Sequence, residues 1–177
     1  DPACHLWPTI MDDFNRFVEM GKKEVVSQDI YDQCQRAWHA ISGNRDAHKL
    51  LTGGIPEVSV FWNDSETQIP MKARFDILKP HAVVDLKTFS NSSGLQVHSA
   101  VAAAVPRYNY HIQPNIYIRA AMAAKQLISS GDIDCAFNNG ILSFPDIKET
   151  PRFFFIFLET GDAPNVLVRE FPRSTPN

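Results

Sequence analysis

The sequence has 177 residues, of which 44% are hydrophobic and 21% are charged, a balance that suits one compact domain with a buried core. The formal net charge of −3 argues against a protein that binds nucleic acid only through diffuse attraction, so any DNA-binding function requires a localised site. Three widely separated cysteines without a C-x-x-C pair exclude a structural zinc site or a four-cysteine iron–sulfur cluster within this sequence, and they favour a reducing cytoplasm.

The two ends of the chain carry few signals of regular structure. Residues 1–20 are predicted to form an irregular segment, and because they begin without Met we expect them to continue from an upstream region. Residues 21–172 are predicted to form one domain and residues 173–177 a frayed tail. No apolar run approaches the roughly 18–20 residues of a membrane span, and no signal-peptide pattern opens the chain. We therefore expect a cytoplasmic protein without a membrane partner.

Two helices are predicted before the first strand. Ser27 is a good N-cap residue with Asp29 in the turn behind it, and Gly43 ends this first helix. Apolar residues recur between these ends at helical spacing, namely Ile30, Tyr31, Cys34, Ala37, Trp38 and Ile41. A shorter helix is predicted over residues 45–51.

Three strands are predicted next, over residues 57–62, 68–78 and 81–89, because these runs are rich in β-branched and aromatic residues. The turns between them are short, which favours an antiparallel meander. A helical stretch over residues 95–129 follows, interrupted by Pro106 and Pro114, and the second proline is expected to kink a helix or to begin a new one.

Two more strands, over residues 152–159 and 165–171, are predicted to form a hairpin near the end of the chain. The element order is therefore α-β-β-β-α-β-β, which indicates an α/β or α+β fold with a central mixed sheet flanked by helices.

The third strand carries an unusual pair of charges. Asp85 and Lys87 are two residues apart in an otherwise apolar run, so strand geometry points both to the same face. Asp76 lies near the end of the preceding strand, and a turn around residues 78–81 would bring the two carboxylates close together. Adjacent carboxylates favour a shared cation, and a hard ion such as Mg²⁺ prefers oxygen ligands. Lys87 could then orient a water nucleophile or stabilise charge on a phosphate.

A structural ion pair on a solvated strand face is the alternative interpretation of Asp85 and Lys87, because surface pairs of this kind are common and contribute little. Lys72, Arg74, Arg107 and Arg119 flank the proposed cleft in sequence and could contact phosphates, although a solvated face explains each one equally well. Trp38, Phe61 and Trp62 are expected to belong to the core rather than to stack on bases.

The motifs together resemble the PD-(D/E)xK nuclease superfamily. The resemblance rests on Glu57, on ARFDIL with Asp76, on VVDLKT with Asp85 and Lys87, and on the helical run YNYHIQPNIY. A helix with Q-x-x-x-Y after the D-x-K strand, here Gln113 and Tyr117, is similar to the RecB-like branch of that superfamily. Within this branch, residues 20–170 look most similar to the RecE-type exonucleases, which include exodeoxyribonuclease VIII.

The resemblance implies a restriction-endonuclease-like core and a role for each matching residue. Asp76, Asp85 and the main-chain carbonyl of Leu86 would bind Mg²⁺, for which Mn²⁺ can substitute, and Lys87 would be the catalytic lysine. Supporting or DNA-binding roles would fall to Glu57, Arg74, Gln113 and Tyr117. His48 and His111 have no assigned role, and the family's upstream histidine has no counterpart in the matching region.

The implied activity is an Mg²⁺-dependent, ATP-independent exodeoxyribonuclease that degrades linear double-stranded DNA from its ends in phage-type recombination. The same resemblance implies a ring-shaped homo-oligomer and a single-strand annealing protein as partner. Two alternatives stay open: an endonuclease or resolvase of the same superfamily, and a non-catalytic DNA-binding module that keeps the fold.

Overall fold

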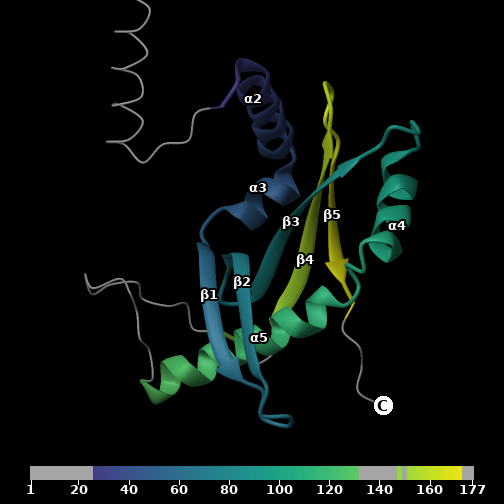
Figure 1. Cartoon of the computed structure of the whole chain (residues 1–177). Helices are drawn as coiled ribbons and strands as arrows, with labels where there is room; N and C mark the ends of the chain where they lie inside the picture. The colour runs from purple at the N-terminus through teal and green to yellow at the C-terminus, as the bar shows by residue number, and fades with distance from the viewer. Residues whose placement is uncertain (1–25, 132–146, 149–150, 173–177) are drawn as a thin grey trace, which may run out of the picture. The chain divides into compact units, whose positions relative to one another are not determined.

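The computed structural model describes residues 26–131, 147–148 and 151–172 (Figure 1). The predicted irregular segment 1–20 and the predicted tail 173–177 lie outside the described residues. The chain divides into two compact units, residues 1–35 and 36–177. In the first unit the structure describes the start of helix α2 (Gln28–Gly43), where the Ser27 hydroxyl accepts a hydrogen bond from the Ile30 N–H at 3.4 Å, as expected of an N-cap residue.

A five-stranded mixed sheet forms the centre of the second unit. The strands are β1 (Ile55–Asn63), β2 (Pro70–Leu78), β3 (Ala82–Ser90), β4 (Arg152–Thr160) and β5 (Val166–Phe171). Their spatial order follows the chain, with antiparallel pairing throughout except for the parallel pair β3–β4. The predicted meander, hairpin and element order are therefore confirmed.

Helices cover both faces of this sheet. One core cluster joins β1–β5 to α4 (Val97–Arg107) and α5 (Gln113–Ser130), and Figure 1 shows α5 crossing below the strands. The other cluster joins β3, β4 and β5 to α3 (Arg45–Leu51) and to the end of α2. The result is the predicted α+β sandwich with a restriction-endonuclease-like core.

Strand β4 shows why the sheet is the central layer. Every second residue of β4 faces α5, namely Phe153, Phe155 and Phe157. The ring centroids of Phe153 and Phe155 are 4.8 Å apart, and those of Phe155 and Phe157 are 5.3 Å apart. Ile156 and Leu158 face the α3 side. A strand that is buried on both faces reads as a continuous apolar run, as this one does. On α5 the large rings meet the small buried residues Ala120, Ala121 and Ala124, which let the helix approach the sheet closely.

The two prolines of the predicted helical stretch have different effects. Pro106 lies inside α4 near its end, and Pro114 occupies the first turn of α5, where its missing N–H would have no helical partner. Pro114 therefore begins a new helix and does not kink an existing one. Gly131 ends α5 in a left-handed conformation with φ of 72°.

The expectation that Trp38, Phe61 and Trp62 belong to the core is wrong for two of them. Trp62 packs against the core on the α5 side, but Phe61 is 69% exposed and Trp38 is 55% exposed. Phe61 is exposed because β1 is an edge strand, and strand alternation turns Phe61 to the side opposite Trp62.

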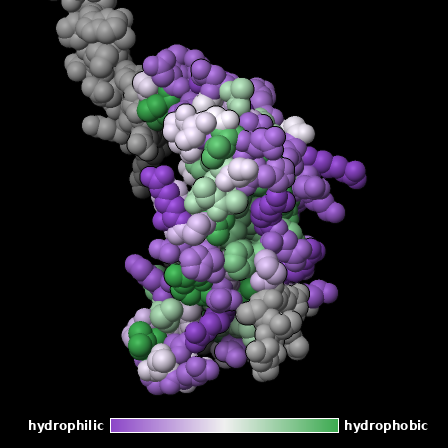
Figure 2. Space-filling view, turned by 90° about the vertical axis from the view of Figure 1, so that its right-hand side faces the viewer, coloured by the Kyte–Doolittle hydropathy of each residue, from purple (hydrophilic) through white to green (hydrophobic). Residues whose placement is uncertain are grey.

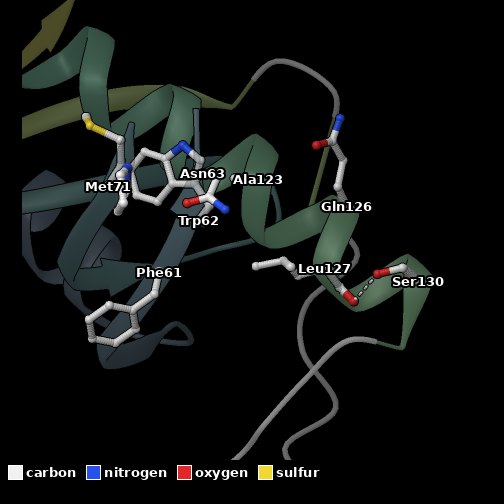
Figure 3. Close-up of a pocket in the computed structure, with 9 residues that line it drawn as sticks. Phe61, Trp62, Asn63, Met71, Ala123, Gln126, Leu127 and Ser130 are labelled. Atoms are coloured by element: carbon white, nitrogen blue, oxygen red, sulfur yellow. Dashed lines mark hydrogen bonds between the residues drawn. The ribbon is translucent and has the colours of Figure 1, made fainter. Parts of the chain in front are cut away.

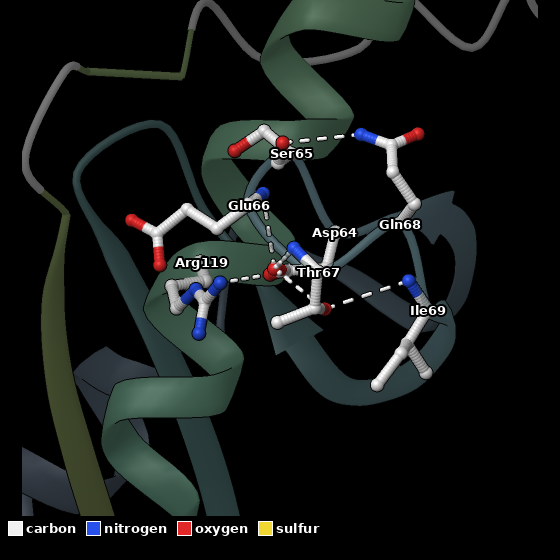
Figure 4. Close-up of polar contacts among 7 residues, drawn as sticks. All are labelled: Asp64, Ser65, Glu66, Thr67, Gln68, Ile69 and Arg119. Carbon is white, nitrogen blue, oxygen red and sulfur yellow. Dashed lines mark hydrogen bonds and ion pairs between the residues drawn. The ribbon is translucent and has the colours of Figure 1, made fainter.

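A polar network organises the turn between β1 and β2 (Figure 4). Asp64 is only 5% exposed and accepts hydrogen bonds from the main-chain N–H groups of Glu66 and Thr67 at 3.3 and 3.0 Å. Its carboxylate also accepts from the Thr67 hydroxyl at 3.0 Å and forms an ion pair with Arg119 of α5. Arg119 is therefore engaged with this turn, which disfavours the phosphate-contact interpretation of that residue.

The surface of the molecule is mainly hydrophilic on the side that Figure 2 presents, where separate apolar areas lie between polar side chains. In the part of the chain that the structure describes, no helix is both long and apolar enough to cross a membrane.

We expect Asp64→Ala to lower the free energy of unfolding by about 1–3 kcal/mol, because it leaves the donors of the turn and the Arg119 guanidinium without their acceptor. Chemical denaturation monitored by circular dichroism measures this loss. Ser65→Ala is the matched control, since the exposed Ser65 side chain lies in the same turn outside this network. Equal stability of the two variants would contradict the structural role of Asp64.

Candidate active site

Strands β2 and β3 separate at the position of the two predicted aspartates. The two strands pair only through Ile77 with Val84 and Leu78 with Val83. Continuing this register places Asp76 opposite Asp85, at the point where the pairing stops. Beyond it β2 stays with β1, and β3 pairs along its whole length with β4. The fork between the strands leaves room for both carboxylates.

A local irregularity in the β1–β2 hairpin turns Asp76 toward the fork. Phe75 and Leu78 both belong to the core cluster on the α5 side, although strict alternation would place residues three apart on opposite faces. Glu57 and Asp76 are the two residues missing from the otherwise continuous β1–β2 ladder, and Glu57 has a φ of 57°. A non-glycine residue in the left-handed region costs on the order of 1–3 kcal/mol and often marks a functional constraint. The break in alternation puts Asp76 on the same side as Asp85.

Asp85 is the buried centre of the site. The residue is 2% exposed, its Oδ1 accepts a hydrogen bond from Gln113 Nε2, and its Oδ2 lies 2.5 Å from Lys87 Nζ. Burial raises the pKa of Asp85, and the negative charge of Asp76 raises it further, while Lys87 and Gln113 act in the opposite direction. The protein therefore holds this carboxylate where ionisation is disfavoured.

Asp76 is anchored by the main chain of the neighbouring strand. Its Oδ2 accepts a hydrogen bond from the Leu86 N–H at 2.7 Å, in place of a ladder bond. The N–H and C=O groups of one strand residue point to the same side, so the Leu86 carbonyl also points toward the fork. Oxygen atoms of Asp76, Asp85 and Leu86 are thus directed to one region.

Lys87 lies in an aromatic surrounding that the sequence did not reveal. Its side chain is 19% exposed, and Nζ lies 5.3 Å from the ring centroid of Tyr110 and 5.9 Å from that of Phe155. Burial raises the pKa of Tyr110, and electrostatic interactions with Tyr108 and Asp85 raise it further. The sequence feature that could have indicated a role for Tyr110 is its position three residues before Gln113.

Gln113 and Tyr117 reach the site from the first turns of α5. Tyr117 packs edge-on against Phe75 and Phe153 with ring centroids 5.6 and 6.1 Å apart. Burial is the main cause that raises the pKa of Tyr117, and Asp85 adds to it, whereas a hydrogen bond with Gln113 lowers it. Asp76, Asp85, Lys87, Gln113 and Tyr117 are therefore all brought together.

The other predicted residues lie at the edge of this group or outside it. Glu57 and Arg74 form an exposed ion pair, with 3.0 Å between Glu57 Oε2 and Arg74 Nε, and Arg74 is close enough to affect the pKa of Tyr117. This pairing favours a structural role for Glu57 over a role beside the two aspartates. His48 and His111 are exposed.

The donor atoms of the site fit a hard divalent cation. The described residues contain no group of three or more histidine, cysteine, aspartate or glutamate side chains that could hold a metal ion. Two carboxylates and one main-chain carbonyl are nevertheless typical of Mg²⁺, which keeps several water ligands. Asp85 Oδ2 is buried and has no hydrogen bond to the residues that the structure describes; its contact there is the ion pair with Lys87. A bound cation would therefore give Asp85 Oδ2 a ligand contact in addition to its ion pair with Lys87.

Comparisons with known proteins agree with this geometry. A family model described as a PDDEXK-like domain of unknown function (DUF3799) matches residues 9–127. A crystal structure of a candidate exonuclease from Eubacterium rectale has the same fold, with a TM-score of 0.56 and 14% sequence identity. The match covers 96% of this chain and 57% of that protein, so this chain spans little more than half of its length. No curated protein matches the chain.

The raised pKa of Asp85 predicts that Asp85→Asn stabilises the protein in EDTA at neutral pH, by about 0.5–2 kcal/mol as for other stability–function trade-offs. Between the ordinary aspartate pKa near 3.8 and the raised folded pKa, the folded state binds more protons than the unfolded state. Wild-type stability therefore falls relative to the variant as pH rises through this window, and the difference then stays constant.

Denaturant unfolding of both proteins at several pH values measures this difference. Asp162→Asn is the control, because the Asp162 side chain is fully exposed. A wild type that gains stability over Asp85→Asn as the pH rises would show that the Lys87 and Gln113 contacts outweigh burial.

Proposed function

Since the chain belongs to this family of PDDEXK-like domains, we propose that it is an Mg²⁺-dependent nuclease, and specifically an exodeoxyribonuclease of linear double-stranded DNA. The observation that carries the proposal is the meeting of Asp76, Asp85 and Lys87 where β2 and β3 separate. Two acids and a lysine in this arrangement can hold a cation and a phosphate side by side, which is what phosphodiester hydrolysis requires.

In this proposal Asp76, Asp85 and the Leu86 carbonyl hold the cation. When bound, Mg²⁺ supplies Lewis acidity that activates water and stabilises the leaving oxygen. The Leu86 N–H keeps Asp76 fixed at 2.7 Å, so one of its oxygens stays available to a ligand. Gln113 orients Asp85 in the same way, because it donates a hydrogen bond to Oδ1 and leaves Oδ2 for the cation.

Lys87 exchanges one anionic partner for another during the reaction. Its Nζ contacts Asp85 Oδ2 at 2.5 Å, the atom that we assign to the cation. If a cation held by Asp85 offset the charge of its carboxylate, the ammonium group of Lys87 would be free to contact the phosphate or the attacking water and to stabilise the developing negative charge. The Tyr110 and Phe155 rings keep Nζ beside the carboxylates by cation–π contact throughout this exchange.

The finer features of the proposal come from the resemblance to RecE-type exonucleases. They are action on DNA ends in phage-type recombination, a ring-shaped homo-oligomer, an annealing protein as partner and a cytoplasmic location. An endonuclease or resolvase would use the same residues on different DNA. A non-catalytic DNA-binding module is the third candidate, and the complete set of two acids and a lysine at the fork argues against it.

Digestion of two matched DNA substrates separates these three functions. One is an end-labelled linear duplex and the other a covalently closed circle of the same sequence, each incubated with Mg²⁺, with Mn²⁺ or with EDTA. Metal-dependent release of nucleotides from the linear ends, with the circle intact, supports the exonuclease. Cleavage of the circle would indicate an endonuclease, and binding of DNA without any cleavage would indicate the non-catalytic module.

We expect Asp76→Asn, Asp85→Asn and Lys87→Met each to lower the rate of this hydrolysis at least about 100- to 1,000-fold, because each removes charge that acts on the cation or on the transition state. Initial rates on the linear duplex measure the loss. Asp162→Asn, at an exposed aspartate, should keep the wild-type rate. Full activity of any of the three variants would remove that residue from the proposed mechanism.

Gln113→Ala tests a positioning role. We expect the Mg²⁺ concentration that gives half-maximal rate to rise about 10- to 100-fold, because Asp85 loses the donor that orients it, while excess Mg²⁺ restores much of the rate. Gln126→Ala, at an exposed position of the same helix, is the control. A loss of rate that no Mg²⁺ concentration restores would instead place Gln113 on the DNA.

A further inference from the structure

A groove runs along the part of β2 that does not pair with β3. It encloses a cavity of about 460 Å³ lined by Ser59, Phe61, Lys72, Ala73, Arg74 and Tyr117. Tyr117 is shared with the candidate active site, so the groove begins at the site and leads away from it along the hairpin. Lys72 lies four residues before Asp76 on the same strand, roughly 13 Å away at 3.3 Å per residue.

Phe61 and two cations face this groove from adjacent strands. Phe61 is the cross-strand partner of Lys72, and Ser59 is the partner of Arg74. Figure 3 shows the Phe61 ring pointing away from Trp62 and not into the core. Phe61 is 69% exposed, and it also lines a second cavity of about 560 Å³ between the hairpin and α5. The Phe61 ring is therefore open to solvent over most of its surface.

The cations of the groove are available to an anionic ligand. Lys72 is exposed and forms no ion pair with any residue that the structure describes. Arg74 pairs with Glu57, but both side chains are more than 60% exposed. An exposed pair of this kind contributes about 0–1 kcal/mol in other proteins, so a phosphate can replace the carboxylate.

A single exposed phenylalanine on an edge strand is common and by itself has no functional meaning. Phe61 differs from such a residue in its position: it is the cross-strand partner of Lys72, which has no ion pair among the described residues, and it lines a groove that also contains Tyr117 of the candidate site. Aromatic rings alternating with cations along a groove are the usual means of binding single-stranded nucleic acid. Inside a duplex the neighbouring bases of the stack cover both faces of each base, so this ring suits an unpaired strand.

We propose that this groove binds a single strand of DNA next to the active site, with one base stacked on Phe61 and phosphates held by Lys72 and Arg74. The inference rests on the proposed nuclease function, because the strand bound in the groove is the one that enters or leaves the site at Asp76 and Asp85. It assigns to Phe61 a binding role that the motif of two aspartates and a lysine does not contain.

Binding of a fluorescein-labelled oligothymidylate of 12 nucleotides to the full chain tests the proposal. Fluorescence anisotropy in EDTA measures affinity without hydrolysis. We expect Phe61→Ala to bind about 5- to 150-fold more weakly than wild type, because one base loses its stacking partner. Phe61→Trp should retain the affinity. Ile69→Ala, a second exposed apolar residue of the same hairpin at 56% exposure, should bind as wild type does.

The salt dependence of the same binding tests Lys72. The logarithm of the association constant should fall less steeply with the logarithm of salt concentration in Lys72→Ala, by about 0.7 for one lost phosphate contact. Wild-type affinity of Phe61→Ala, or no binding of the oligonucleotide by wild type, would overturn the groove. Because the assay contains no metal, a failure of the nuclease proposal leaves this result unaffected, and a failure here leaves the hydrolysis experiment unaffected.

Discussion

The separation of β2 from β3 is the constraint on which the site depends. Antiparallel strands normally satisfy each other's main-chain groups along their full length, and here the pairing ends after Ile77 and Val84. The Leu86 N–H, which a longer ladder would have satisfied, is satisfied by the Asp76 carboxylate. One hydrogen bond thus both compensates for the missing ladder and fixes an acid of the candidate site. The same separation opens the edge of β2 along which the groove with Phe61 runs.

Burial of Asp85 follows from this arrangement and has two consequences. Desolvation disfavours the ionised carboxylate, and Lys87 and Gln113 offset this effect only in part. Asp85 is therefore expected to weaken the fold, which is unusual for a side chain at the centre of a sheet and is typical of residues that serve function at the expense of stability. The low dielectric of the same environment strengthens every interaction that the carboxylate makes with a cation. The predicted loss of stability and the proposed affinity for a cation would thus have one cause, the burial of Asp85.

The helices, the strands and the charged residues of the candidate site can be predicted from the sequence, but the contacts around those residues cannot. Hydrophobic period and turn residues predict the strands, and the spacing of Asp85 and Lys87 indicates the candidate site because opposite charges rarely occupy a buried strand without a ligand. The left-handed conformation of Glu57 and the contact of Tyr110 with Lys87 depend on strands and loops far apart in the chain. Phe61 was assigned to the core because its type predicts burial, whereas the edge position of β1 decides its exposure.

Helix α5 connects the stability of the fold to the chemistry of the site. Its buried alanines, Ala120, Ala121 and Ala124, allow the helix to lie close against the phenylalanines of β4, and this packing sets the height of the helix above the sheet. Gln113, the first residue of the helix, contacts Asp85 from that position. Pro114 fixes where this first turn begins. A larger residue in place of one of the alanines would therefore displace the amide from the carboxylate, and a change in the core would act on the site through one hydrogen bond.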